Sequence, residues 1–224
     1  MDSLSRDEVR EIDRRAIEVA GVPGAVLMEN AGRCAADEIE QFMAGRAARR
    51  VAVVAGAGNN GGDGHVIARH LNMRGAETVT FLVAPAGRIS ADARINLDIL
   101  RKLGADVREV AGGGGLAEHL RRFDLIVDAV GGTGIRGALR GEPAAAVEAI
   151  NAAAQSTPVV AVDIPTGLDC DTGHVDGPAV TAAMTVTFVA RKKGFDAPGA
   201  SAWTGEVRVV DIGVPAETLA AMSD

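Results

Sequence analysis

The spacing of hydrophobic residues changes near position 50 of the chain. Before it, apolar residues recur every three or four positions, as in amphipathic helices; after it, short apolar runs rich in valine alternate with helical patterns. The runs predict strands at 51–55, 78–84, 124–130, 158–164, 184–190 and 206–212. The patterns between them predict helices at 65–74, 92–103, 116–122 and 142–154.

Two further helices are predicted before the first strand. Ser5 and Glu8 have the spacing of a capping box, in which the serine and the glutamate side chains satisfy free amides at the start of a helix. The second helix is predicted to start at Pro23, because proline suits the first helical turn. The apolar face of the first helix is predicted to consist of Val9, Ile12, Ala16, Ile17 and Val19.

Apolar strands that alternate with helices indicate a parallel sheet covered by helices on both faces. We therefore predict a doubly wound α/β fold, to which the two leading helices are an addition. The chain has 224 residues, of which 47% are hydrophobic, and this is enough for one full core. We predict one domain, residues 1–224.

The charge and the cysteines narrow the possible partners and compartment. A net charge of −7 without a basic patch argues against nucleic-acid and anionic-membrane binding, and the short basic run 191–193 is interpreted as a strand end. Cys34 and Cys170 form no C-x-x-C pattern, which predicts free thiols in a reducing compartment. No apolar stretch reaches membrane length and the start is polar, so we predict a cytoplasmic protein without a membrane partner.

Three loops that leave predicted strands have unusual compositions. They are 56–64 (GAGNNGGDG), 128–137 (DAVGGTGIRG) and 163–169 (DIPTGLD). Ligands of open α/β sheets bind beyond the carboxyl ends of the strands, where such loops converge. The first two loops each contain G-x-G-x-x-G, which lets a backbone approach a phosphate closely but is a weak signal alone. Two tight turns are the alternative interpretation.

Carboxylates close two of the apolar runs. Asp128 and Asp163 each close a run of valine, isoleucine or alanine, where a carboxylate is costly unless it is paired, hydrogen-bonded or bound to a cation, so both are functional candidates. Thr166 is expected to direct its hydroxyl into the same space as Asp163. Asp63, taken by itself, is interpreted as a cap of the helix at 65, and His65 is expected to face solvent.

Two enzyme classes are disfavoured by what the chain lacks. The second predicted strand ends in LVAPAGR, without the acidic residue that holds the ribose hydroxyls in ordinary NAD dehydrogenases. No pattern of serine, histidine and carboxylate suggests covalent catalysis. A nucleotide phosphate remains a reasonable ligand.

The motifs in combination resemble a known family. NNGGDG followed by HVIARHL, then DAVGGTGIRG, VDIPTGLD and VRVVDIGVP, resemble NAD(P)H-hydrate (NAD(P)HX) epimerases in order and spacing, as does the leading VREIDRRAIEVAGVPGAVLMENAG. The resemblance implies a three-layer α/β/α Rossmann-like fold with a mainly parallel sheet, usually in a homodimer, and a bound potassium ion. It also implies that NADHX or NADPHX is the substrate, and that a separate dehydratase acts on the product, since no dehydratase follows Asp224.

The resemblance also implies roles for individual residues. Potassium would be held by Asn60, Asp128 and Thr166. The hydrated nucleotide would be bound by Asn59, Asn60, Gly61, Gly62, Asp63, Gly132, Thr133, Gly134, Ile135, Arg136, Gly137, Ala138 and Asp163.

The chemistry of the reaction requires a proton donor. The hydroxyl of hydrated NAD(P)H sits on the carbon next to the ring nitrogen, whose lone pair expels it once an acid protonates it. Water then returns to the other face. Asp163 is our candidate for the carboxyl group that gives and retakes this proton. Two alternatives stay open, namely a non-catalytic binding or scaffold module of the same fold and an unusual nucleotide-dependent oxidoreductase.

Overall fold

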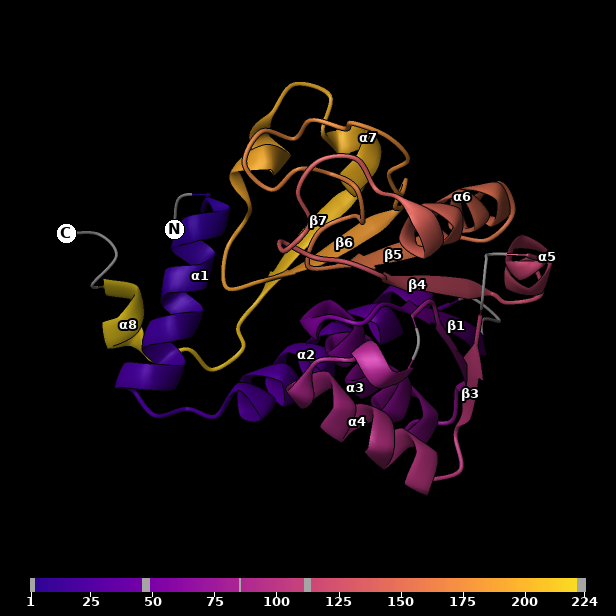
Figure 1. The fold of residues 1–224 in the computed structure, drawn as a ribbon, viewed down its shortest axis with the longest axis horizontal. Coiled ribbons are helices and arrows are strands. Elements are labelled where there is room, and N and C mark those ends of the chain that lie inside the picture. The colour runs from indigo at the N-terminus through magenta and orange to yellow at the C-terminus, as the bar shows by residue number, and fades with distance from the viewer. Residues whose placement is uncertain (1–2, 46–48, 85, 111–113, 221–224) are drawn as a thin grey trace.

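A parallel β-sheet forms the centre of the molecule (Figure 1). The computed structural model describes residues 3–45, 49–84, 86–110 and 114–220, and in them the sheet has seven strands in the order β3-β2-β1-β4-β5-β6-β7. Every neighbouring pair is parallel. The strands are β1 (Arg50–Ala55), β2 (Glu77–Leu82), β3 (Asp106–Glu109), β4 (Leu125–Ala129), β5 (Val159–Val162), β6 (Met184–Phe188) and β7 (Glu206–Val210).

Helices cover both faces of this sheet, which confirms the predicted doubly wound α/β fold. Because side chains alternate along a strand, Val51 and Val53 of β1 pack against α2 (Gly24–Met43) and α3 (Asn59–Met73). Ala52 and Val54 pack on the other side, against α5 (Leu116–Leu120) and α6 (Gly141–Ala154). α4 (Ala91–Lys102) packs beside α3. Figure 1 shows α2, α3 and α4 on one side of the sheet and α5 and α6 on the other.

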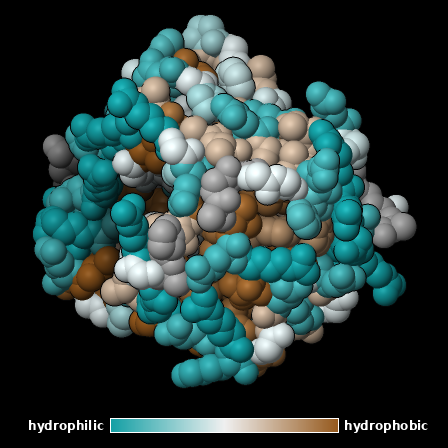
Figure 2. Space-filling model, turned by 45° about the vertical axis from the view of Figure 1, so that its right-hand side comes forward, coloured by the Kyte–Doolittle hydropathy of each residue, from teal (hydrophilic) through white to brown (hydrophobic). Residues whose placement is uncertain are grey.

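The polarity of the surface is as expected for a sheet whose apolar faces are covered by helices. On the face in Figure 2, hydrophilic residues predominate, and hydrophobic ones are seen mostly in recesses between them. No helix in the described part of the chain is both long enough and apolar enough to cross a membrane. The remaining short elements are the 3₁₀ turns η2 (Ala86–Arg88) and η3 (Lys193–Asp196) and the helices α7 (Ser201–Thr204) and α8 (Ala216–Ala220).

Four details of the predicted elements were wrong. β3 was missed because this short edge strand is mostly exposed and has no apolar run. α3 begins at Asn59 and not near 65, so two thirds of the first glycine loop is helix. Pro23 is the residue before α2 and not its first helical residue. The first helix ends in a π-helical turn, η1 (Arg15–Val19), and Val19, predicted on the apolar face, is 75% exposed.

The first helix, α1 (Arg6–Arg14), is attached to the carboxyl end of the sheet. The predicted capping box is present, with Ser5 N donating to Glu8 Oε2 at 2.6 Å. Leu4 forms an isolated parallel bridge with Lys192. Arg6 is 1% exposed; its Nη1 donates to the carbonyl of Ile135 at 2.6 Å and its Nη2 to Asp169 Oδ2 at 2.9 Å. These contacts fix α1 against loops that follow β4, β5 and β6.

Two glycines allow the loop after β1 to pass closely over its neighbours. A Cβ on Gly56 would lie 2.0 Å from the carbonyl oxygen of Val130, which follows β4. A Cβ on Gly61 would lie 2.0 Å from the carbonyl oxygen of Gly56 itself. Both atoms are backbone, so they have little room to move. The start of α3 is therefore held directly against the end of β4.

We predict that Gly56→Ala lowers the free energy of unfolding by about 1–3 kcal/mol, because the new methyl group overlaps the Val130 carbonyl. Gly58→Ala is the matched control, since no atom lies within 4 Å of its added Cβ and its φ of −86° suits alanine. We expect the control to change stability by less than about 1 kcal/mol. Urea unfolding measures both variants, and a Gly56→Ala variant as stable as the wild type would contradict the close approach.

Candidate active site

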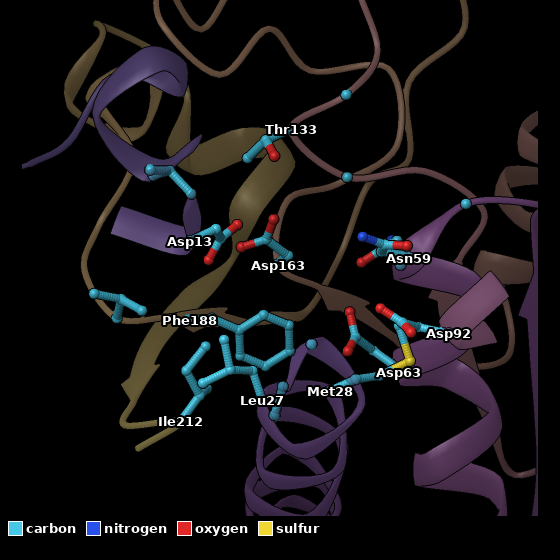
Figure 3. A pocket seen from close by; sticks show the side chains of 18 of the residues that line it. Asp13, Leu27, Met28, Asn59, Asp63, Asp92, Thr133, Asp163, Phe188 and Ile212 are labelled. Carbon is cyan, nitrogen blue, oxygen red and sulfur yellow. The ribbon is translucent and has the colours of Figure 1, made fainter. Parts of the chain in front are cut away.

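A cavity of about 430 Å³ opens at the carboxyl ends of the strands. Two of the predicted loops form much of it, with Asn59, Asn60 and Asp63 from the start of α3 and residues 131–135 from the segment after β4. Asp163, after β5, also lines it. Helices and the segments at and after the ends of β6 and β7 contribute the rest, and Figure 3 shows Leu27, Met28 and Asp92 together with Asp13 of α1 around the same space.

Asp163 is held in a strained position by a buried ion pair. Its φ is +64°, a left-handed conformation that is uncommon for a residue with a side chain, and its amide donates to the carbonyl of Val186 at 2.7 Å. Lys192 Nζ lies 2.9 Å from Asp163 Oδ1. In such a buried pair each charge stabilises the other. Asp163 therefore presents a carboxylate to the cavity.

Lys192 itself is entirely shielded from solvent. Its ammonium group donates to Thr187 Oγ1 at 2.9 Å and to the carbonyls of Phe188 at 3.0 Å and Ala190 at 3.2 Å. Oxygen atoms thus surround the ammonium group, and these contacts offset the free-energy cost of burying its charge. The residue was missed from the sequence, where it lies in the basic run 191–193 interpreted only as a strand end.

Two further carboxyl groups of the cavity have pKa values above the usual range of an aspartate. Burial and, to a smaller extent, the charge of Asp163 raise the pKa of Asp13 to about 6, against the opposing charge of Lys192. Burial also raises the pKa of Asp63 well above its usual value, with contributions from the charges of Asp163 and Asp13. The cavity therefore combines one ion-paired carboxylate with two carboxyl groups that hold protons more tightly than usual.

Asp128 and Thr166 form a buried network behind the cavity. Thr166 N and Oγ1 donate to the two oxygens of Asp128, at 2.9 and 2.7 Å. The same hydroxyl also lies 3.0 Å from the carbonyl oxygen of Gly131 and accepts from the amide of Gly131 at 3.0 Å. Both side chains are fully buried, and burial raises the pKa of Asp128 to about 6 against these hydrogen bonds. The network joins the loops after β4 and β5.

The structure places only part of the predicted substrate set around the cavity. Asn59, Asn60, Asp63, Gly132, Thr133, Gly134, Ile135 and Asp163 line it. Gly61 and Gly62 instead pack against Gly56 and Met28. Arg136 is exposed and pairs with Asp7 at 3.8 Å, and Gly137 and Ala138, like Arg136, do not line the cavity.

Two expectations about the first loop were wrong. Asp63 does not cap a helix at 65, because it lies inside α3 with its side chain buried. His65 was expected to face solvent but is completely buried, and burial lowers its pKa to about 4. Both errors follow from the earlier start of α3, which turns this segment toward the sheet. Asp13 was also missed, because nothing in the helical pattern of residues 6–14 distinguishes it from a surface carboxylate.

The cavity has the composition of a nucleotide site that moves protons. Glycines open the backbone on one side, one ion-paired aspartate and two aspartates with raised pKa values lie in the middle, and apolar side chains such as Leu27, Phe188 and Ile212 form another wall (Figure 3). No group of three or more histidine, cysteine, aspartate or glutamate side chains suited to a metal occurs among the described residues.

Residues 24–194 match the family described as YjeF-related protein N-terminus. This chain belongs to that family. The match includes all three predicted loops and begins at the first residue of α2, so α1 with Asp13 lies before it.

Relatives of known name cover almost the whole chain. An NAD(P)H-hydrate epimerase of Rhodopirellula baltica is 43% identical over 96% of this chain and 86% of its own length. A bifunctional NAD(P)H-hydrate repair enzyme Nnr of Moorella thermoacetica is 43% identical over 95% of this chain, which spans only 41% of that enzyme. The crystal structure of the yeast protein ynu0 (YNL200c) superposes with a TM-score of 0.84 at 26% identity, over 100% of this chain and 94% of that one.

We predict that Asp13→Asn raises the free energy of unfolding at pH 8 by about 1–2 kcal/mol. The pKa of Asp13 rises on folding from 3.8 to about 6, so its contribution to stability is lost as the pH rises through this interval. The asparagine side chain does not ionise, so the stability of the variant does not fall as the pH rises through this interval. Its advantage should shrink at pH 4.5, where the native carboxyl group stays protonated.

Urea unfolding at the two pH values measures this difference. Asp98→Asn, on the exposed side of α4, is the control and should change stability little at either pH. An Asp13→Asn variant that is less stable than the wild type at pH 8 would show that the Asp13 carboxylate is stabilised in the native cavity, contrary to the prediction.

Proposed function

We propose that this protein is an NAD(P)H-hydrate epimerase, which interconverts the R and S epimers of hydrated NADH and NADPH. The observation that carries the proposal is the family membership together with a relative of this name that matches over nearly its whole length. The cavity supports the proposal independently. The reaction needs proton transfer next to a nucleotide, and the cavity offers carboxyl groups for the proton transfer and a glycine-rich backbone for the nucleotide.

The reacting ring would lie between the apolar wall and the carboxyl groups. Leu27 and Phe188 offer a surface for a flat ring, and Asp163 and Asp63 reach the same space. The segment after β4 would hold the rest of the nucleotide. A side chain at position 132 would narrow the entrance, since a Cβ at Gly132 would lie only 3.2 Å from Asp163 Oδ2. A glycine at this position keeps the carboxylate accessible.

Asp163 would take part in the proton transfer as the carboxylate of its pair with Lys192. When water adds to the cationic ring, it must lose a proton, and a positioned carboxylate accepts it. The same negative charge stabilises the ring cation formed when the hydroxyl leaves. General acid–base assistance of this kind is typically worth about a hundred- to ten-thousand-fold in rate.

The residues expected to bind potassium fit such an ion. Both polar atoms of the Asn60 side chain are buried without a hydrogen-bond partner. The single proton of the Thr166 hydroxyl faces two acceptors, Asp128 Oδ1 and the carbonyl of Gly131, which leaves oxygen lone pairs in excess. Asn60 lies beside Gly132, which follows Gly131 in the chain, since its Oδ1 would be 3.4 Å from a Cβ on Gly132. Asn60, Asp128 and Thr166 would hold the cation, whose charge would offset the burial of Asp128.

The name of one relative indicates what happens to the product of the proposed reaction. The name of the bifunctional relative, of which this chain spans about two fifths, suggests that a second repair step follows, and we propose that a separate dehydratase carries it out on the epimerised product. The homodimer and the cytoplasmic location remain predictions. A purely scaffolding role is less favoured, because Asn59, Asn60 and Asp63 are present and line the cavity.

We expect the purified protein to equilibrate the R and S epimers of NADHX or NADPHX without ATP. Chromatography of a single epimer with and without protein measures the conversion above the spontaneous rate. Asp163→Asn keeps the shape of the side chain but loses the proton acceptor, and its rate should fall by about a hundred-fold or more. The control Asp98→Asn should retain full activity. An epimer ratio that the wild type leaves unchanged at high concentration would exclude the proposed function.

We expect potassium to stabilise the protein specifically. An ion bound at about a hundred times its Kd adds about 2.7 kcal/mol, which is several degrees in Tm for a chain of this size. Thermal melting in potassium chloride and in an equal concentration of tetramethylammonium chloride tests this for the wild type and for Asp128→Ala. The wild type should melt higher in potassium and the variant equally in both salts; equal melting of the wild type would contradict the site.

A further inference from the structure

The proposed reaction needs an acid as well as a carboxylate. The hydroxyl group leaves the ring only after it is protonated, and Asp163 is committed to an ion pair with a fully buried lysine. In this pair Asp163 is the carboxylate, which can accept a proton but has none to give at the start of the reaction. A second group in the cavity is therefore better suited to supply the proton.

Asp13 meets the geometric requirement for this group. It lines the same cavity as Asp163 and Lys192, and Figure 3 shows the carboxyl groups of Asp13 and Asp163 directed toward each other. Within the described residues Asp13 has no ion-pair partner of its own. The charged or titratable side chains that share the cavity with it are Asp63, Asp92, Asp163 and Lys192, so three of its four neighbours are acidic.

The position of Asp13 is fixed by the segment that carries Lys192. Leu4, just before α1, accepts a hydrogen bond from the amide of Lys193 at 2.8 Å and donates one to the carbonyl of Arg191 at 2.8 Å. Arg6 then ties the first turn of α1 to Ile135 in the glycine-rich segment. Two attachments, to the segment after β4 and to the segment after β6, thus orient the helix. Asp13 is held where the substrate would bind, although it precedes residues 24–194, which match the family model.

We propose that Asp13 is a second catalytic residue, the acid that protonates the departing hydroxyl of the hydrated nicotinamide ring, with Asp163 as its ionised counterpart. This inference rests on the proposed function. Burial raises the pKa of Asp13 to about 6, so near neutral pH a larger fraction of this carboxyl group carries a proton than of an ordinary aspartate.

The steps balance without any further reagent. The Asp13 carboxyl proton passes to the hydroxyl oxygen, the C–O bond breaks with its electron pair leaving on water, and the ring-nitrogen lone pair forms a C=N bond. Water then adds to the other face of this cation, its oxygen donating the pair that restores the nitrogen lone pair, and its extra proton goes to the Asp163 carboxylate. Exchange with water returns the proton from Asp163 to Asp13. Nothing is oxidised or reduced.

The test compares Asp13→Asn with the wild type in epimerisation of NADHX, after subtraction of the spontaneous rate. We expect kcat to fall by about a hundred-fold or more while the Kd of the nucleotide changes only a few-fold. Asp13→Glu keeps a titratable proton on a longer side chain and should recover part of the rate. Asp98→Asn again serves as the control with unchanged activity.

The pH dependence separates an acid from a residue that merely supports the fold. For the wild type, kcat/KM should decline as the pH rises above about 6, because Asp13 loses its proton. In Asp13→Asn this decline should disappear. Thermal melting of the variant shows whether it is folded; if it does not fold, the wild-type profile decides, and a profile without that decline overturns the proposal.

The outcomes distinguish this inference from the function on which it rests. A wild type that does not epimerise NADHX or NADPHX at all excludes the proposed function, and this role of Asp13 with it. A wild type that is active while Asp13→Asn keeps its rate within about three-fold leaves the function intact and overturns only the role of Asp13.

Discussion

The shape of the cavity depends on the contact between Lys192 Nζ and Asp163 Oδ1, which are 2.9 Å apart. It joins the end of β5 to the segment after β6 at a point where Asp163 has a left-handed backbone. The same segment pairs with Leu4, so the placement of the first helix depends on it as well. A buried ion pair adds little net stability compared with apolar residues of the same size, but losing one partner costs several kcal/mol. The ion pair here mainly fixes a position, because it holds the carboxylate of Asp163, whose backbone is strained, at the cavity wall.

Close packing of backbone imposes the second constraint. Gly56 and Gly61 let the start of α3 lie against the end of β4, so the amide and carboxyl side chains of α3 reach the cavity instead of solvent. This arrangement also explains the buried carboxyl group of Asp63 and the buried imidazole of His65. Burying each of these polar groups costs free energy and so offsets part of the hydrophobic stabilisation of the core. They persist because the helix carrying them contributes Ile67 and Leu71 to that core.

The sequence was sufficient to predict the fold and the loops but not the complete cavity. Apolar periodicity is a property of the whole segment, so the doubly wound sheet was predictable, except for β3, whose charged residues DVRE give no apolar run. Asp128 and Asp163 were recognisable because a carboxylate at the end of an apolar strand is conspicuous. Asp13 and Lys192 were not, since each lies in a local pattern that is equally compatible with a solvent-facing residue. Their burial results from contacts between segments nearly 180 residues apart, for which one sequence contains no local signal.

The distribution of protons in the cavity follows from where its carboxyl groups come from. One positive charge, Lys192, is available to Asp13, Asp63 and Asp163, and it lies 2.9 Å from Asp163 alone. The other two are therefore buried beside a negative charge, which favours keeping their protons. A site with one fixed carboxylate and a neighbouring carboxyl proton needs no external reagent to protonate a leaving hydroxyl and deprotonate an incoming water. Because that neighbouring group sits on α1, the docking of the N-terminal segment and the protonation state of the cavity are physically linked.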